Sequence, residues 1–302
     1  MSPSPTTAPR AWLDSDVGVE AHAPRTSDMG LQRSIGSCRI VLRGSEHGNQ
    51  LVDICQRSPV RVLFPTVGPA GIEEAVLINT SGGIAGGDRL ETAVTALADA
   101  HITVTSQAAE RIYRALDGPS RISTTLIVAN SAKLSWCPQE TIVFDRARMK
   151  RQTHISVASG AELLALESIV LGRAAHGETV VSGEVIDSWR VEKDGRLVWA
   201  DCLRITDDVF PHVGRNALLA DCSAVATLVY FGTDLEKRLE CLRDCAASLR
   251  CHAAATMVGG LIVVRFAAPA ASTLRAGLCS VLQQFDHAFG PGPFRVPKMW
   301  SC

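Results

Sequence analysis

The chain has 302 residues, of which 46% are apolar and 20% are charged, so its composition is that of a globular protein that can bury a large core. Lys and Arg number 30 and Asp and Glu 31, and this balance disfavours nucleic acid and anionic membranes as partners. No apolar run is as long as the roughly 18 residues of a spanning helix. The N-terminus also lacks the apolar region of a secretory signal, so we expect a cytoplasmic protein that does not enter the membrane.

Residues 1–32 are rich in Pro, Ser, Thr and Ala and show neither the helical nor the strand period. They predict a disordered tail, and residues 33–302 predict a single domain. The ten cysteines are scattered over a chain that can build its own core. We therefore expect reduced and mostly buried thiols instead of disulfides.

Strands dominate the domain up to about residue 215. Period-two alternation with β-branched residues predicts about ten short strands by Ala200, and Asp194 with Gly195 predicts a hairpin turn between the last two. The clearest strands are expected at residues 38–43, 60–64, 90–95, 101–105, 122–128, 154–157, 178–181, 185–191 and 197–199.

The remaining part, residues 216–302, shows a different pattern. Leucines at helical spacing predict an amphipathic helix over residues 234–251. A strand at 257–266 and a second helix at 272–289, which stops before Gly-Pro-Gly-Pro, are expected to follow. A βαβ unit in this part is one open arrangement. The fold expected from these patterns is mainly β, with two helices near the C-terminus.

Residues 79–88 read Asn-Thr-Ser-Gly-Gly-Ile-Ala-Gly-Gly-Asp and are the most unusual stretch of the chain. They do not form a phosphate-binding loop, because no Gly-Lys-Ser/Thr follows and the glycine spacing is wrong for a dinucleotide site. A tight connection between strands is the simplest interpretation. Asp88 is then either a ligand or the cap of a turn.

Residues 107–114 crowd polar and charged side chains directly after a predicted strand. They form either a surface turn with solvated ion pairs or a contact surface, in which Tyr113 and Arg114 are the candidate partner-binding residues. Residues 134–145 predict a further strand with an irregularity at Pro138. Cys137 in that segment has no histidine near it in sequence, so burial is favoured over a nucleophilic role.

Glu167 lies in an almost wholly apolar run, where a carboxylate is costly unless it is paired or binds a ligand. Arg173 or Arg114 could supply an ion pair. Glu178 could instead join it as a second carboxylate, which would suit acid/base chemistry or metal binding. A separate group, Cys241, Cys245, Cys251 and His252, resembles a metal site only weakly, and core packing of the thiols is favoured.

Taken in order, these segments resemble the urease accessory protein family UreD, called UreH in some species. The resemblance covers residues 33–302. It rests on the 79–88 loop, Gln-Ala-Ala-Glu at 107–110, Tyr113-Arg114, the 136–145 strand, Glu167, Leu-Gly-Arg at 171–173, Gly-Glu at 177–178 and Arg-Val-Pro-Lys-Met-Trp at 295–300. Ser81, Cys137 and Lys298 depart from residues that are usual in the family.

The resemblance implies a β-helix-like stack of sheets and a scaffold without catalytic activity. It implies a chaperone of metallocentre assembly that binds apo-urease with UreF and the GTPase UreG, and that holds no tightly bound cofactor while transient Ni²⁺ passes to the urease active site. Candidate nickel-path carboxylates are those of Asp88, Glu140, Asp145, Glu167 and Glu178, and Trp300 is the candidate anchor for a UreF-like partner. The alternative is a carbohydrate-active enzyme on a β-helical scaffold that uses Glu167 and Glu178.

Overall fold

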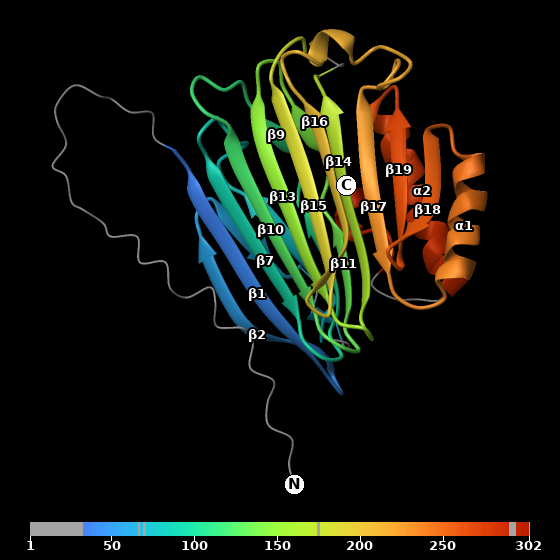
Figure 1. Ribbon diagram of the computed structural model, residues 1–302. Helices are drawn as coiled ribbons and strands as arrows, with labels where there is room; N and C mark the ends of the chain where they lie inside the picture. The colour runs from blue at the N-terminus through green and yellow to red at the C-terminus, as the bar shows by residue number, and fades with distance from the viewer. Residues whose placement is uncertain (1–32, 66, 69–70, 174–175, 290–293, 302) are drawn as a thin grey trace, which may run out of the picture. The chain divides into compact units, whose positions relative to one another are not determined.

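The computed structural model describes residues 33–65, 67–68, 71–173, 176–289 and 294–301, and strands make up 52% of the structure. The strands form two sheets (Figure 1). Sheet A contains, in spatial order, β16 (Arg196–Ile205), β15 (Glu184–Lys193), β13 (Arg148–Val157), β10 (Ser120–Val128), β7 (Arg89–Ala96), β1 (Ile35–Ser45), β2 (Gly48–Arg57), β5 (Gly71–Ile72) and β4 (Val67–Gly68). Sheet B contains β18 (His252–Val258), β19 (Leu261–Ala268), β17 (Ala224–Phe231), β14 (Glu162–Leu171), β11 (Lys133–Cys137), β8 (His101–Ser106), β6 (Glu74–Asn79) and β3 (Val60–Leu63), with β12 (Thr141–Val143) paired to β14 and β9 (Glu110–Ile112).

The long central strands arise from a coiled path of the chain. Strands β7, β10 and β13 lie in sheet A, while β8, β11 and β14, which follow each of them in the chain, lie in sheet B. Neighbouring coils pair in parallel, as in the register of Arg121 with Arg89 and with Lys150. The result is a β-solenoid-like stack of about 4 turns, which confirms the expected mainly β, β-helix-like fold with two C-terminal helices.

Alternation along each strand decides what lies between the sheets. In β13, Met149, Ile155 and Val157 point inward and are buried, whereas Lys150 and His154 face outward. The inward side chains of both sheets form one continuous apolar core. A polar residue at an inward position is therefore buried between the sheets.

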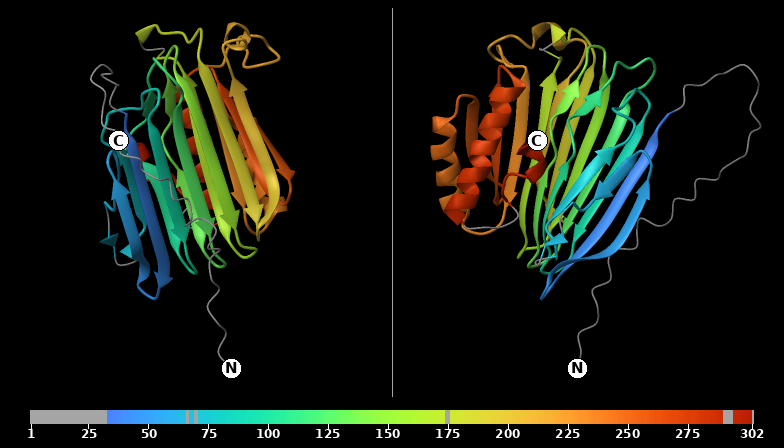
Figure 2. Two further views of the ribbon diagram at one scale, coloured as in Figure 1. Left: turned by 60° about the vertical axis from the view of Figure 1, so that its left-hand side comes forward. Right: turned by 180° about the vertical axis from the view of Figure 1, so that it is seen from behind.

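Antiparallel strands and two helices complete the fold (Figure 2). The hairpin β15–β16 forms one edge of sheet A, the hairpin β1–β2 lies near the other edge next to β5 and β4, and β17, β19 and β18 extend sheet B. Helices α1 (Leu235–Ser248) and α2 (Ala271–Phe289) pack on the outer face of sheet B and bury a second core. Strand β14 is consequently buried on both faces, with Leu163 toward sheet A and Leu164 toward the helices. Short 3-10 helices lie at Phe210–His212 and Lys298–Ser301.

Most local predictions agree with this structure, and two do not. The turn at Asp194 and Gly195 is confirmed, since both residues have positive φ and connect β15 to β16. The single strand predicted at 257–266 is wrong, because Gly259 and Gly260 turn the chain into the hairpin β18–β19. The βαβ arrangement is present in split form, because α1 connects β17 to β18 and these two strands run parallel on either side of the antiparallel β19. Residues 178–181 are a loop in place of the predicted strand, because they pair with no described strand.

Two further expectations concern the strand at 134–145 and the tail at 1–32. The predicted 134–145 strand is split at Pro138 into β11 and β12. The predicted tail, residues 1–32, lies outside the described residues.

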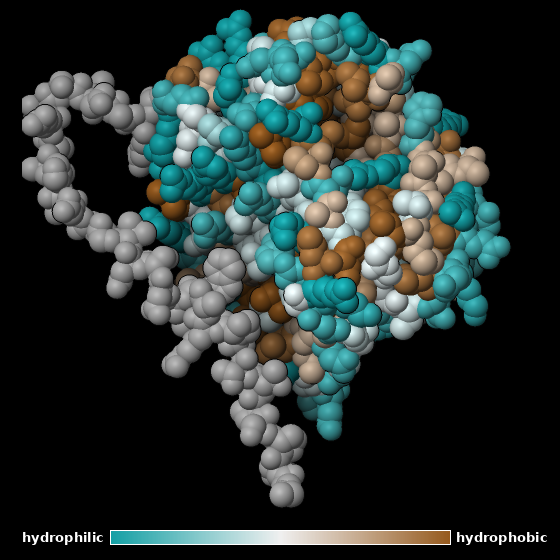
Figure 3. Space-filling model, viewed as in Figure 1, coloured by the Kyte–Doolittle hydropathy of each residue, from teal (hydrophilic) through white to brown (hydrophobic). Residues whose placement is uncertain are grey.

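None of the described helices combines the length and the apolar character needed to cross a membrane. On the face viewed in Figure 3, apolar side chains lie in separate patches between hydrophilic ones.

Candidate functional site

A buried ionic cluster lies between the two sheets. Arg151 of β13 donates from Nη1 to Glu167 Oε2 of β14 at 2.7 Å, and from Nε and Nη2 to the two carboxylate oxygens of Asp187 in β15 at 2.8 and 3.0 Å. The exposed fractions are 3% for Arg151, 5% for Glu167 and 5% for Asp187. Two carboxylates thus share one guanidinium away from bulk water.

Neutral side chains complete the coordination of the cluster. The Trp136 indole donates to Glu167 Oε1 at 2.8 Å, and Arg151 Nη1 also donates to the Thr141 hydroxyl at 3.0 Å. Burial raises the pKa of Glu167, the nearby charge of Arg151 opposes this shift, and the charge of Asp187 adds to it. Burial lowers the pKa of Arg151, but the charges of Asp187 and Glu167 outweigh that effect and its pKa is raised overall. Arg151 is therefore a permanent buried cation.

Polar side chains continue from the cluster along the inner face of sheet A. Thr92, Thr124 and Thr153 occupy the same register position on three adjacent strands, directly beside the position of Arg151. Thr153 is 1% exposed and its hydroxyl has no hydrogen-bond partner among the described residues, and the same is true of the Trp189 indole nitrogen. Buried polar atoms without a protein partner are the usual places for internal water. This part of the interior is suited to hold water.

Two pockets reach the cluster from different parts of the solenoid. Pocket 1, of about 370 Å³, lies among β15, β16, β17, β18 and β19 and is lined by Glu167 and Asp187. Pocket 2, of about 260 Å³, lies among β3 and β6 to β12 and is lined by Glu167 and Arg151. Strands β13 and β14 stand between these two groups of strands in their sheets. Glu167 is therefore common to two cavities that the ionic cluster separates.

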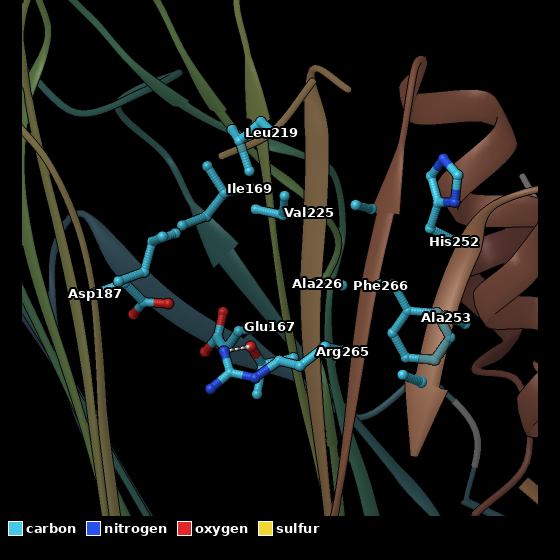
Figure 4. Close-up of a pocket in the computed structure, with 14 residues that line it drawn as sticks. Glu167, Ile169, Asp187, Leu219, Val225, Ala226, His252, Ala253, Arg265 and Phe266 are labelled. Atoms are coloured by element: carbon cyan, nitrogen blue, oxygen red, sulfur yellow. Dashed lines mark hydrogen bonds between the residues drawn. The ribbon is translucent and has the colours of Figure 1, made fainter. Parts of the chain in front are cut away.

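Figure 4 shows pocket 1 with Glu167, Asp187 and Arg265 directed toward the same space between the sheets. Arg265 donates to the Thr227 hydroxyl at 2.9 Å and forms an ion pair with Asp201. The Arg265 side chain is 47% exposed, so this polar group lies at the solvent side of the pocket. Pocket 1 thus runs from an exposed polar rim to the buried cluster.

The 79–88 loop shapes the outer part of pocket 2. Asn79 donates from Nδ2 to both carboxylate oxygens of Glu110, at 3.0 and 3.1 Å, and both residues line the pocket. The Tyr113 hydroxyl donates to the Gly82 carbonyl at 3.0 Å and so ties the loop to the segment after β9. Burial raises the pKa of Glu110, although its bonds to Asn79 and Arg111 oppose the shift. The glycine loop is therefore a structural wall with a carboxylate beside it.

Gly83 is the position in this wall where a side chain cannot fit. A Cβ there would lie 2.4 Å from the Tyr113 ring and 2.9 Å from the Arg111 carbonyl oxygen, and φ is +152°. We expect Gly83→Ala to lower the free energy of unfolding by about 1–3 kcal/mol, measured by urea denaturation. Gly118→Ala is the control, because a Cβ at Gly118 meets nothing within 4 Å. Equal stability of the two variants would show that the loop moves freely away from Tyr113.

The other four predicted nickel-path carboxylates line neither pocket. Asp88 caps its own loop by accepting from the backbone nitrogens of Ser34 and Ala85, both at 2.8 Å. Asp145 likewise accepts from the backbone nitrogens of residues 181 and 182. For Asp88, the turn-cap alternative is the one the structure supports.

Glu140 and Glu178 each bind an arginine outside the buried cluster. Glu140 pairs with Arg275 at 2.8 Å, and Glu178 pairs with Arg173 at 2.8 Å. The hydrogen bond from Arg173 is the main cause that lowers the pKa of Glu178. Glu167 does have an ion-pair partner, but it is neither of the two candidates, Arg173 and Arg114, because the stacked coils bring Arg151 opposite it instead.

The partner-binding candidates differ in exposure. Tyr113 is half-buried and meets Phe144 edge-on at 5.2 Å, whereas Arg114 is exposed and forms no ion pair within the described ranges. Trp300 is only 7% exposed, and its indole donates to Thr105 Oγ1 at 3.2 Å and to the Cys137 carbonyl at 3.3 Å. Because the Trp300 ring is buried, little of it is available to contact a partner.

The cysteines of interest belong to the core. Cys137 is fully buried, and burial raises its pKa to about 12, so it stays protonated. Cys245 and Cys251 pack in the core under the helices, while Cys241 is half-buried and His252 is exposed. No three His, Cys, Asp or Glu side chains gather into a metal-binding group anywhere in the described part of the chain.

Local sequence patterns did not single out Arg151, Asp187 or Glu110 as site residues. A signal for Arg151 and Asp187 was present, because both occupy inward positions of alternating strands in which most other inward side chains, such as Met149 and Val185, are apolar. A charged residue at a core position of an alternating strand needs a partner of opposite charge. Which strand supplies that partner depends on the pairing of the coils, which no local pattern gives.

The fold and the cluster together define a β-solenoid scaffold whose interior holds two cavities separated by buried charge. A family model described as UreD urease accessory protein matches residues 34–301. The chain is 36% identical over 296 residues to the urease accessory protein UreD of Xanthobacter autotrophicus, covering 98% of this chain and 99% of that protein. It is 40% identical over 258 residues to the UreD of a Methylobacterium species (83% and 89%) and 37% identical over 271 residues to that of a Chelativorans species (90% and 95%). The chain belongs to the UreD family of urease accessory proteins, and its role lies in urease maturation.

Proposed function

We propose that this protein is a non-catalytic scaffold that binds apo-urease together with UreF and UreG and passes nickel to the urease active site through its interior. Membership of an accessory family supports the role in maturation. The observation that supports an interior route is that two cavities, of about 370 and 260 Å³, share the carboxylate of Glu167. Nickel is the transient cargo of this route, and the protein keeps no tightly bound cofactor.

The chemistry of the interior suits a hydrated divalent ion in transit. Thr92 and Thr124 present hydroxyls to pocket 2, and Glu110 and Glu167 present carboxylates to it. Oxygen ligands of this kind bind Ni²⁺ less tightly than clusters of imidazole and thiolate do. A path with spaced oxygen ligands lets the ion enter and leave, which a delivery route requires.

A carbohydrate-active enzyme receives less support from the geometry. Acid/base hydrolysis needs two carboxyl groups facing one cleft. Glu167 is buried against Arg151, whereas Glu178 lies after β14 with Arg173 and lines neither pocket with Glu167. The two proposed catalytic groups thus have different surroundings and different partners.

The proposed route is tested at Glu167. We expect Glu167→Gln to lower the rate of urease activation at limiting Ni²⁺ by about ten-fold, because a neutral amide is a poorer ligand for a divalent ion. The amide keeps one acceptor where the carboxylate meets both Arg151 and Trp136, so the free energy of unfolding should fall by about 1–3 kcal/mol. Activation is measured in an extract lacking the native protein, per folded molecule, together with the nickel content of urease.

Glu91→Gln is the matched control, since Glu91 is an exposed carboxylate on the outer face of β7. It should activate urease like the unchanged protein. If Glu167→Gln also activates urease normally per folded molecule, nickel does not use this interior, and the cluster has only a structural role.

A further inference from the structure

A buried cation, the guanidinium of Arg151, stands at the residue that the two pockets share. Arg151 lines pocket 2, Asp187 lines pocket 1 and Glu167 lines both. The guanidinium binds the two carboxylates at once, through Nη1 to Glu167 and through Nε and Nη2 to Asp187. An ion moving from one pocket to the other along Glu167 must therefore pass Arg151.

A divalent cation and a guanidinium repel each other strongly in a buried site, where the dielectric screening is weak. Both cations also compete for the same oxygen atoms. Two carboxyl groups face one guanidinium, so a cation that reaches the cluster meets oxygen atoms that Arg151 already occupies. Passage requires that Arg151 release at least one of the two carboxylates.

We propose that Arg151 is the gate of the interior route. In the closed state its guanidinium occupies the place between Glu167 and Asp187, and a divalent ion takes that place only while Arg151 turns away. Return of Arg151 displaces the ion onward, which keeps the carboxylate pair from trapping it. This inference rests on the proposed passage of nickel and adds a positioning residue that acts through Glu167 and Asp187.

The gate is tested by adding metal ions to the purified chain and measuring its thermal unfolding. Arg151→Met leaves the two carboxylates free, so 1 mM NiCl₂ should raise the unfolding midpoint of this variant by about 5 °C or more, and that of the unchanged protein by about 1 °C or less. MgCl₂ serves as the comparison for non-specific ionic effects. Arg151→Lys is the second variant in case Arg151→Met does not fold, and its midpoint should respond to nickel to an intermediate degree, because one ammonium cannot bind both carboxylates as the planar guanidinium does.

The neutral triple variant Arg151→Met, Glu167→Gln, Asp187→Asn is the matched control and should show no nickel response. If neither Arg151→Met nor Arg151→Lys gains a nickel response beyond that of the triple variant, Arg151 does not compete with the ion and the gate is overturned. That result differs from failure of the proposed function, which is recognised by normal urease activation with Glu167→Gln. A nickel response in Arg151→Met together with impaired activation by Glu167→Gln supports both.

Discussion

Arg151→Met is expected to lower the free energy of unfolding at neutral pH by about 3–5 kcal/mol, because removal of one partner leaves uncompensated charge in the core. Both carboxylates lose their counter-ion together, since Glu167 and Asp187 bind the same guanidinium. Chemical denaturation measures the change. The control is Arg148→Met in the same strand, whose side chain is 40% exposed and pairs with Asp207 and Glu184, and which should cost no more than about 1 kcal/mol.

The loss of unfolding free energy in Arg151→Met should be larger at high pH than at low pH. Arg151 is the main group that opposes the upward shift of the Glu167 pKa, and burial and Asp187 both raise it. Without Arg151 the folded-state pKa rises further above that of the unfolded chain, so the folded variant binds more protons. Its stability is then lost as pH rises through the raised pKa and recovered as pH falls toward the ordinary glutamate value. A deficit that grows on acidification would contradict this account of the cluster.

Trp300→Ala is expected to lower the free energy of unfolding by about 3 kcal/mol, since the ring is buried and the cavity left by a large aromatic is costly. The Trp300 ring packs under the Arg275 guanidinium, which lies 5.2 Å from its centroid and also donates to the Trp300 carbonyl. The same arginine pairs with Glu140, so the residue joins the C-terminal segment to α2 and to the chain between β11 and β12. Urea denaturation is the measurement.

Trp300→Phe separates packing from hydrogen bonding, because it keeps most of the ring and removes only the bonds to Thr105 and Cys137, at a cost of about 1 kcal/mol. Affinity for a UreF-like partner is then compared at equal folded fractions. If Trp300→Ala kept the full stability but lost partner binding, the ring would belong to an interface and the originally predicted anchor would be correct. Loss of stability with unchanged affinity of the folded fraction would assign it to the chain's own C-terminal packing.

Local patterns were sufficient for the elements whose neighbours in space are also neighbours in sequence. The hairpin at Asp194 and Gly195 and the two helices follow from turn chemistry and leucine spacing, which act within a few residues. The strand predicted at 257–266 failed where two successive glycines reversed the chain, although that signal was present in the sequence. Strand β14 escaped assignment because it is buried on both faces, which removes the alternation by which a strand is recognised.

The sequence by itself determined the family, the β-rich character of the chain and the fact that Glu167 needs a polar partner. The identity of that partner was decided by tertiary structure alone. Arg151 and Asp187 lie 16 and 20 residues from Glu167, on strands of the opposite sheet, and they reach it because successive coils stack in register across the interior. Such pairing depends on the summed packing of whole strands, which local sequence patterns do not encode. The same packing separates Glu178 from Glu167 and places a carboxylate that both pockets share, that of Glu167, beside Arg151.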